Sequence, residues 1–201
     1  MKLAIGLTTL ALLAPLPALA DPYVIFGGAT GSVDMGAIES NYGPGADDSD
    51  TFNRVIAGIG GRVNQNLGVE ISYLSKVTNS VSQSGNQDNL SHEGVQFGLL
   101  GYLPVARNVD LFAKVTANYL DTSYNTNAAV ISNTPGQYYQ EDHNETHFGF
   151  GGGVEFNIAQ NMALRATLEQ IQMQSVVNSN FLGRSGDFNV NQGSVALMVY
   201  F

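Results

Sequence analysis

The amino-acid sequence predicts an all-β fold, an eight-stranded antiparallel up-and-down barrel that spans a membrane. Three observations carry this prediction. Apolar side chains alternate with polar or small ones in segment after segment, up to the final residue Phe201. The connections between these segments alternate between long and short. Only 12% of the residues are charged, about half the share of a soluble domain.

The first residues predict that the chain is exported. Lys2 precedes an apolar run over residues 3–13, and Ala18-Leu-Ala20 has the small-residue pattern of a signal-peptide cleavage site. The apolar run is too short for a membrane-spanning helix. We therefore expect residues 1–20 to be a cleaved signal peptide and residues 21–201 to form a single barrel domain.

The composition limits how such an exported chain is stabilised and what it binds. There is no cysteine, so burial and backbone pairing must hold the fold together without disulfides. Lys and Arg number 8 against 17 Asp and Glu, and this acidic balance argues against nucleic acid as a partner. Glycine, at 23 residues, is abundant. A helix-poor, glycine-rich and sparsely charged exported chain is typical of a membrane β-barrel.

The first three expected strands lie in the N-terminal part of the mature chain. Residues 23–30 are apolar on both faces, so the face that points inward stays open. Residues 52–63 alternate apolar residues with arginines and glycines. A tight turn at residues 64–66 joins this strand to residues 67–74, whose alternation is clear. The two segments are therefore expected to form a hairpin.

The same pattern recurs in the middle of the chain. Residues 94–103 alternate Val, Phe and Leu with Gly and Gln, and a short connection at residues 104–108 leads to the next strand at residues 111–119. Residues 147–156 alternate phenylalanines with glycines before a short turn at residues 157–161. These segments are the fourth, fifth and sixth expected strands.

The seventh segment, residues 162–171, admits two interpretations. Leu164, Leu168 and Ile171 lie at the helical spacing i, i+4, i+7, and the residues are good helix formers. The same residues also alternate as a strand. We favour the strand because a barrel that lacks one strand would leave an open edge in lipid. Residues 189–201 complete the eight.

The connections predict how the barrel is oriented. Short periplasmic turns and long extracellular loops are typical of outer-membrane barrels. With eight strands, both ends of the barrel domain are expected on the periplasmic side. Four long extracellular loops are expected, at residues 32–51, 76–91, 121–145 and 174–188.

The chain resembles the small eight-stranded outer-membrane barrels of the OmpA membrane-domain, OmpX and opacity-protein type. The resemblance rests on residues 60–73, on Gly152-Gly-Val-Glu-Phe156 and on Phe201, and it covers essentially the whole mature chain. It is specific for the fold and weak for any activity. Full-length OmpA carries a peptidoglycan-binding domain that is not expected here, so a cell-wall anchoring role is not carried over.

The resemblance also implies a location and partners. The expected location is the outer membrane of a Gram-negative bacterium, surrounded by outer-membrane lipids and lipopolysaccharide. Periplasmic chaperones and the barrel-assembly machinery are the expected partners during biogenesis, and Val199 and Phe201 of the last strand are implied as the assembly signal. No cofactor or metal is expected, because His143 and His147 lie in a loop that runs into a strand.

The charged residues of inward parity are the candidate functional site. Because buried charges must pair, we expect Glu155 and Arg165 to form an ion pair across their turn. Barrels of the OmpA type carry a comparable cluster, and the resemblance implies a plug or gate at Glu70, Lys114, Glu155 and Arg165. The charges either only fill the lumen or gate a path for small ions; a gate predicts that Lys114→Ala or Arg165→Ala raises conductance. The inward charges are Arg62, Glu70, Lys114, Glu155, Arg165 and Glu169.

These features favour a non-enzymatic outer-membrane barrel. Its acidic loops are the expected contact surface, for envelope integrity or for surface binding and adhesion. A narrow gated ion channel, porin-like in action, is the alternative. A lipid A-modifying enzyme is less favoured, because such barrels work with a His and a Ser facing lipid, whereas His92 and His147 have inward parity.

Overall fold

The computed structural model describes residues 21–34, 47–49, 51–83, 86–126, 139–173 and 188–201. The expected signal peptide lies outside these residues. Among them, no helix is long and apolar enough to cross a membrane.

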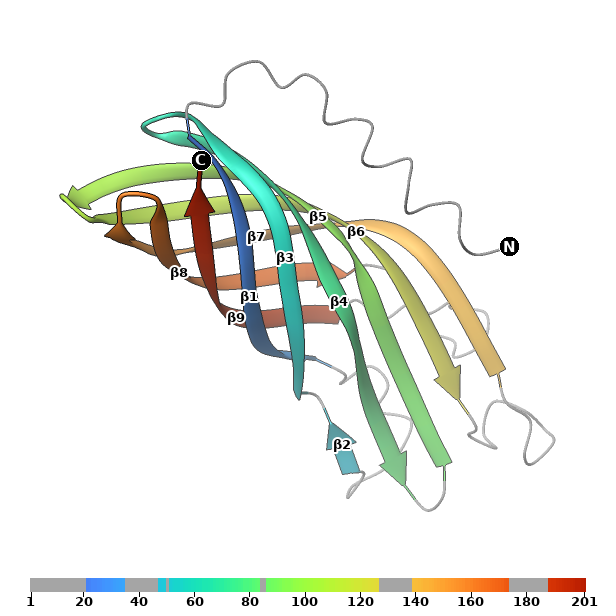
Figure 1. Cartoon of the computed structure of the whole chain (residues 1–201). Helices are drawn as coiled ribbons and strands as arrows, with labels where there is room; N and C mark the ends of the chain where they lie inside the picture. Colours follow the sequence, from blue (N-terminus) through green and yellow to red (C-terminus); the bar gives the residue numbers. More distant parts are fainter. Residues whose placement is uncertain (1–20, 35–46, 50, 84–85, 127–138, 174–187) are drawn as a thin grey trace.

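The described residues form nine β-strands (Figure 1). Eight are long, and β2 has only three residues. Their bounds are β1 (Asp21–Val33), β2 (Asp47–Ser49), β3 (Thr51–Asn64), β4 (Leu67–Gln83), β5 (Asn86–Ala106), β6 (Val109–Thr126), β7 (Tyr139–Ala159), β8 (Met162–Met173) and β9 (Phe188–Tyr200).

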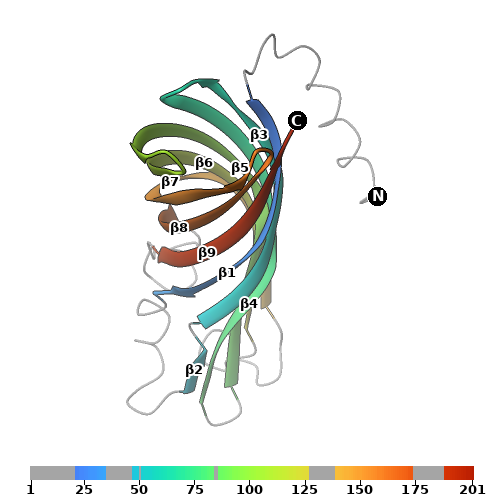
Figure 2. The ribbon, with the colours of Figure 1, turned by 60° about the vertical axis from the view of Figure 1, so that its left-hand side comes forward.

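The eight long strands close into an antiparallel barrel, as predicted. Each pairs with its neighbours in the chain, β4 pairs with β5, and β1 pairs with β9, so the sheet has no open edge among these eight strands. The short strand β2 pairs with β4 beyond the start of β3 and adds no strand to the barrel wall (Figure 2). In lipid this closure is required, because every backbone N–H and C=O must find a partner within the protein.

The seam between β1 and β9 joins the first strand to the last. Their register runs from Tyr23 opposite Tyr200 to Val33 opposite Val190. Beyond β9, the backbone N–H of Phe201 donates to the carbonyl oxygen of Pro22 at 3.0 Å. The proposed role of this strand in assembly stays a prediction.

The segment at residues 162–171 is a strand, as favoured above. In β8, Leu168 is 74% exposed toward the outside, whereas Ala163 and Arg165 are buried in the lumen. The face of β1 left open by the sequence is also settled: Tyr23 points inward, where its hydroxyl donates to Glu70 at 2.9 Å, and Phe26 points outward. Tyr23 faces the lumen because its hydroxyl group needs a hydrogen-bond partner that lipid cannot supply.

Two of the expected loops are shorter than predicted. Residues 76–91 were expected to be a long loop but form a hairpin, in which β4 runs to Gln83 and β5 begins at Asn86. Within residues 121–145, β6 continues to Thr126 and β7 begins at Tyr139. Figure 1 shows these two hairpins extending beyond the other strands. The polar sequence marks where the strands leave the apolar layer, and the backbone pairing continues past that point.

The exposed aromatic residues mark the same boundary. Tyr73, Tyr119 and Phe148 are exposed on the outside, as a girdle requires. All three lie within the long strands β4, β6 and β7. The Tyr73 hydroxyl donates to Glu93 at 2.9 Å, so polar side chains begin at this level of the barrel.

Candidate functional site in the barrel lumen

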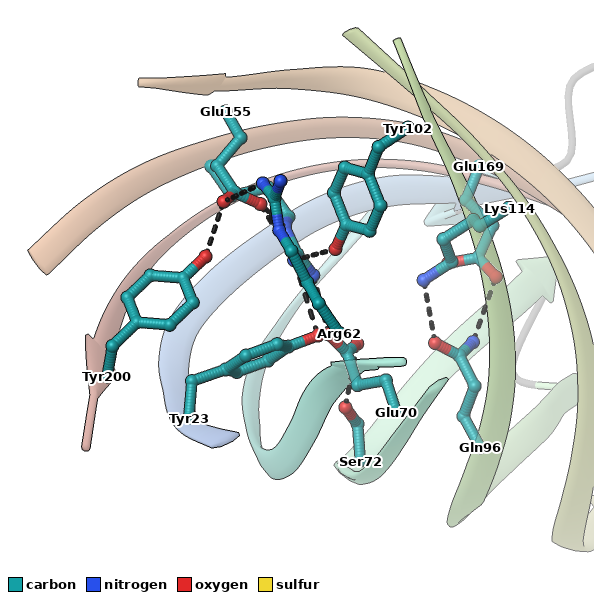
Figure 3. Close-up of polar contacts among 11 residues, drawn as sticks. Tyr23, Arg62, Glu70, Ser72, Gln96, Tyr102, Lys114, Glu155, Glu169 and Tyr200 are labelled. Carbon is teal, nitrogen blue, oxygen red and sulfur yellow. Dashed lines mark hydrogen bonds and ion pairs between the residues drawn. The ribbon is translucent and has the colours of Figure 1, made fainter. Parts of the chain in front are cut away.

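Arg165 is the centre of the charged lumen. Its Nη1 donates to Glu70 Oε2 at 2.5 Å, and its Nη2 donates to Glu155 Oε2 at 2.9 Å and to the Tyr102 hydroxyl at 2.8 Å. The side chain of Arg165 is 3% exposed and that of Glu155 is fully buried. Figure 3 shows Glu155, Tyr102 and Glu70 converging from separate strands. The guanidinium therefore joins β8 to β4, β5 and β7.

A second arginine extends this cluster toward the short turns. Arg62 Nη2 donates to Asp110 Oδ2 at 2.5 Å and to Glu155 Oε1 at 3.0 Å. Its guanidinium carbon lies 4.1 Å from the ring centroid of Tyr102, a cation–π contact. The Tyr200 hydroxyl donates to the same carboxylate of Glu155 (Figure 3). Glu155 therefore bridges the two arginines.

Lys114 makes its direct contacts in a second, neighbouring cluster. Its Nζ lies 3.1 Å from Glu169 Oε2 and donates to Gln96 Oε1 at 2.8 Å. Gln96 in turn donates to Glu169 Oε1 at 2.9 Å, which closes a three-membered ring of contacts (Figure 3). Thr116 and Gln192 also donate to Glu169. Glu169 is thus a carboxylate with donors on both oxygens.

The predicted four-residue site is therefore only partly a single site. The expected ion pair between Glu155 and Arg165 is confirmed, with the two residues directly opposite each other in the register. Glu70 joins them, but Lys114 makes its ion pair with Glu169. Strands in a barrel are tilted and staggered, so counting residues from a turn does not give depth. Lys114 also lies farther from the start of its strand than Arg165 does.

Sequence reasoning missed Asp110 as a lumen charge. It lies two residues before Phe112 and therefore shares the inward parity of that strand, but it precedes the strand expected at residues 111–119. Its carboxylate is the 2.5 Å partner of Arg62. The signal that could have found it was this parity, combined with an otherwise unpaired inward arginine.

Above the charged clusters, toward the long loops, lies a mixed polar layer. Arg54 hydrogen-bonds His92, and its guanidinium carbon lies 4.6 Å from the ring centroid of Phe52. His92 and His147 are 1% and 4% exposed, so both face the lumen as their parity predicted.

Apolar side chains fill the lumen on both sides of the polar layers. At the short-turn end, Tyr23, Ile25, Ala163, Ala196 and Met198 pack together. The larger apolar cluster lies at the long-loop end and draws on most of the strands. It consists of Val33, Phe52, Leu74, Val77, Leu90, Leu120, Tyr124, Ile171, Met173 and Val190.

Comparisons with known proteins agree with this architecture. A family model described as outer membrane protein beta-barrel domain matches residues 6–201. A search of curated proteins gave no match.

Several solved structures have a similar fold at low sequence identity. One of them is Ail, the attachment invasion locus protein of Yersinia pestis, in complex with the heparin analogue sucrose octasulfate. Its sequence is 16% identical, its TM-score is 0.54, and the match covers 90% of this chain and 98% of the Ail chain. Neisserial surface protein A is 14% identical with a TM-score of 0.52, and the match covers 89% of this chain and 97% of that chain. OprG from Pseudomonas aeruginosa is 9% identical with a TM-score of 0.55, and the match covers 90% of this chain and 95% of that chain.

Proposed function

The chain belongs to the outer-membrane β-barrel domain family, and on that premise we propose that it is a non-enzymatic membrane anchor that presents acidic surface loops. It is a protein of the Gram-negative outer membrane. One observation carries the proposal: two ion clusters, stacked between two apolar clusters, fill the lumen. A filled eight-stranded barrel is rigid and offers no wide path. The biological contact is then made outside the membrane, on the hairpins and loops.

The charge of the loops indicates which ligands they favour. Most of the acidic residues of the chain that are outside the lumen lie in or beside the long connections, and the net charge is −9. A surface of this sign favours basic proteins, or divalent cations shared with lipopolysaccharide, and repels polyanions. The Ail structure holds a sulfated heparin analogue. The acidic loops of this chain instead favour positively charged ligands.

A loop replacement tests the adhesive role. Replacing residues 121–145 with a short Gly-Ser linker removes the acidic residues Asp121, Glu141, Asp142 and Glu145. It should abolish binding of whole cells to a host or neighbouring surface and leave the barrel folded. The same linker in place of residues 79–90, the end of the β4–β5 hairpin with one acidic residue, serves as the matched control. Folding is checked by heat-modifiable migration of the outer-membrane fraction. Unchanged adhesion would favour a structural role in envelope integrity over adhesion.

The alternative function, a narrow gated channel, makes a different prediction for Lys114. Because the apolar cluster around Phe52 and Leu120 also closes the lumen, Lys114→Ala should leave conductance in planar bilayers at the wild-type level. Val115→Ala, on the lipid-facing side of the same strand, is the matched control. A rise in conductance confined to Lys114→Ala would favour a gate whose only barrier is the charged layer.

A lipid A-modifying enzyme is the less favoured alternative. Such a role requires reactive side chains at the lipid-facing surface near the outer rim. His92 and His147 instead lie buried in the lumen, and His92 is hydrogen-bonded to Arg54. This placement supports the non-enzymatic proposal.

A further inference from the structure

The outer wall of the barrel carries a hollow that the proposed function does not use. It consists of two adjoining depressions of about 730 Å³ and about 590 Å³, which share Thr30, Leu168 and Gly193 among their lining residues. These volumes lie within the range of small-molecule sites. The hollow crosses β3, β1, β9, β8 and β7, and Figure 2 shows β1, β8 and β9 bending along their length.

The strand register explains why the wall is hollow here. Three glycines lie on the outward face within a few residues of one another, and they form its floor. Gly28 pairs with Val195, Gly193 pairs with Leu168, and Leu168 pairs with Gly152. Leu168 is 74% exposed and Val195 is 61% exposed, so large apolar side chains project next to glycines that have no side chain.

Polarity changes along the length of the hollow. The part nearer the short turns is lined by Val154, Ala166 and Val195. The part nearer the long loops is lined on its outward face by hydroxyl and amide side chains together with Phe150. The polar members are Thr30, Ser32, Thr51, Gln170 and Asn191.

This gradient matches a lipid of the outer leaflet. An acyl chain of the lipid fits the apolar part of the hollow. The region of the lipid that links its acyl chains to the headgroup carries ester, amide and hydroxyl groups, which can hydrogen-bond to the polar part. Among the described residues, the charged ones that line the hollow are Arg54 and Glu169, and both side chains are buried in the lumen. The contacts to the lipid are therefore uncharged, below the level of its phosphates.

We propose that this hollow is a docking site for one acyl chain of lipopolysaccharide. The hollow opens onto the wall that faces bilayer hydrocarbon, and its polar end lies on the long-loop side, which faces the outer leaflet. Lipopolysaccharide is the lipid of that leaflet. The site is independent of the loop contacts proposed above, so either proposal can fail without the other.

Two glycines allow the hollow to be filled without disturbing the fold. A Cβ at Gly28 would have its nearest neighbour at 3.8 Å, and one at Gly193 would lie 3.4 Å from Leu168 Cδ2. Both are ordinary van der Waals distances. Gly101 on β5 is the matched control, because it is exposed and a Cβ there would meet nothing within 4 Å.

The test measures lipids retained by the purified barrel with native mass spectrometry. The wild type and Gly101→Leu should each retain one lipopolysaccharide in preference to phosphatidylethanolamine. The double variant Gly28→Leu, Gly193→Leu should lower that retention about tenfold. Equal retention by the double variant, or equal retention of both lipids by the wild type, would overturn the proposal.

A second measurement does not depend on filling the hollow. The chain has no Trp, so a single one reports locally. Phe150→Trp at the hollow is compared with Phe97→Trp on β5, both lipid-facing, in phospholipid vesicles titrated with lipopolysaccharide. The change in tryptophan fluorescence at position 150 should saturate at a low lipopolysaccharide content of the vesicles. The change at position 97 should rise only in proportion to that content. Identical titrations at both positions would contradict a specific site.

Discussion

Replacing Gly153 with valine is expected to prevent the barrel from folding. Gly153 lies on β7, where a Cβ would collide with the carbonyl oxygen of Ala166 on β8 and lie 2.9 Å from Cζ of Phe112. Overpacking alone costs about 1–3 kcal/mol. Here the obstacle includes backbone, so relief requires separating β7 from β8. In lipid each backbone group left without a partner costs several kcal/mol.

The measurement is heat-modifiable migration of the outer-membrane fraction. The folded band should be nearly absent for Gly153→Val. Gly101→Val is the control, because the space around a Cβ at that position is open. A folded band of wild-type intensity for Gly153→Val would show that the close approach of β7 and β8 is not required.

Arg165→Met is expected to produce the largest loss of stability among the lumen variants. The substitution removes the ion-pair partner of Glu70, which is 7% exposed, and one of the two ion-pair partners of Glu155, which is fully buried. Breaking a buried ion pair from one side costs about 3–5 kcal/mol, because the remaining charge is left uncompensated. The unfolding midpoint in urea, measured in lipid vesicles, should fall accordingly.

Two further variants separate this cause from simple loss of packing. Adding Glu70→Gln to Arg165→Met removes the stranded charge and should restore part of the lost stability. Lys76→Met removes an exposed positive charge from β4 and should leave the midpoint unchanged. If Arg165→Met unfolds at the wild-type urea concentration, the central ion cluster does not hold the barrel together.

The pairs that sequence reasoning found are those that the chain brings together locally. Glu155 and Arg165 flank one short turn, so their parity and spacing were enough to predict their ion pair. The partner of Arg165 across the lumen, Glu70, lies 95 residues away in the chain. Its direct contact with Arg165 could be suspected from charge alone but not assigned.

The errors have a common physical origin. The resemblance grouped Lys114 with Arg165, but the ion pair of Lys114 is with Glu169, because the tilt and stagger of the strands decide which inward side chains meet. The hairpin at residues 76–91 was expected to be a loop because its residues are polar. Polarity reports contact with water, whereas strand pairing is a property of the backbone and continues beyond the membrane.

By itself, the sequence determined which side chains face lipid and which face the lumen in every barrel strand except β1, because strand geometry imposes period two on each segment. It also determined the number of barrel strands and their antiparallel order. Only the tertiary structure decided which lumen charges meet between strands distant in the sequence, and it alone revealed the hollow beside Gly28 and Gly193. Both depend on the stagger and bending of strands in the closed barrel, which a single strand's sequence does not encode.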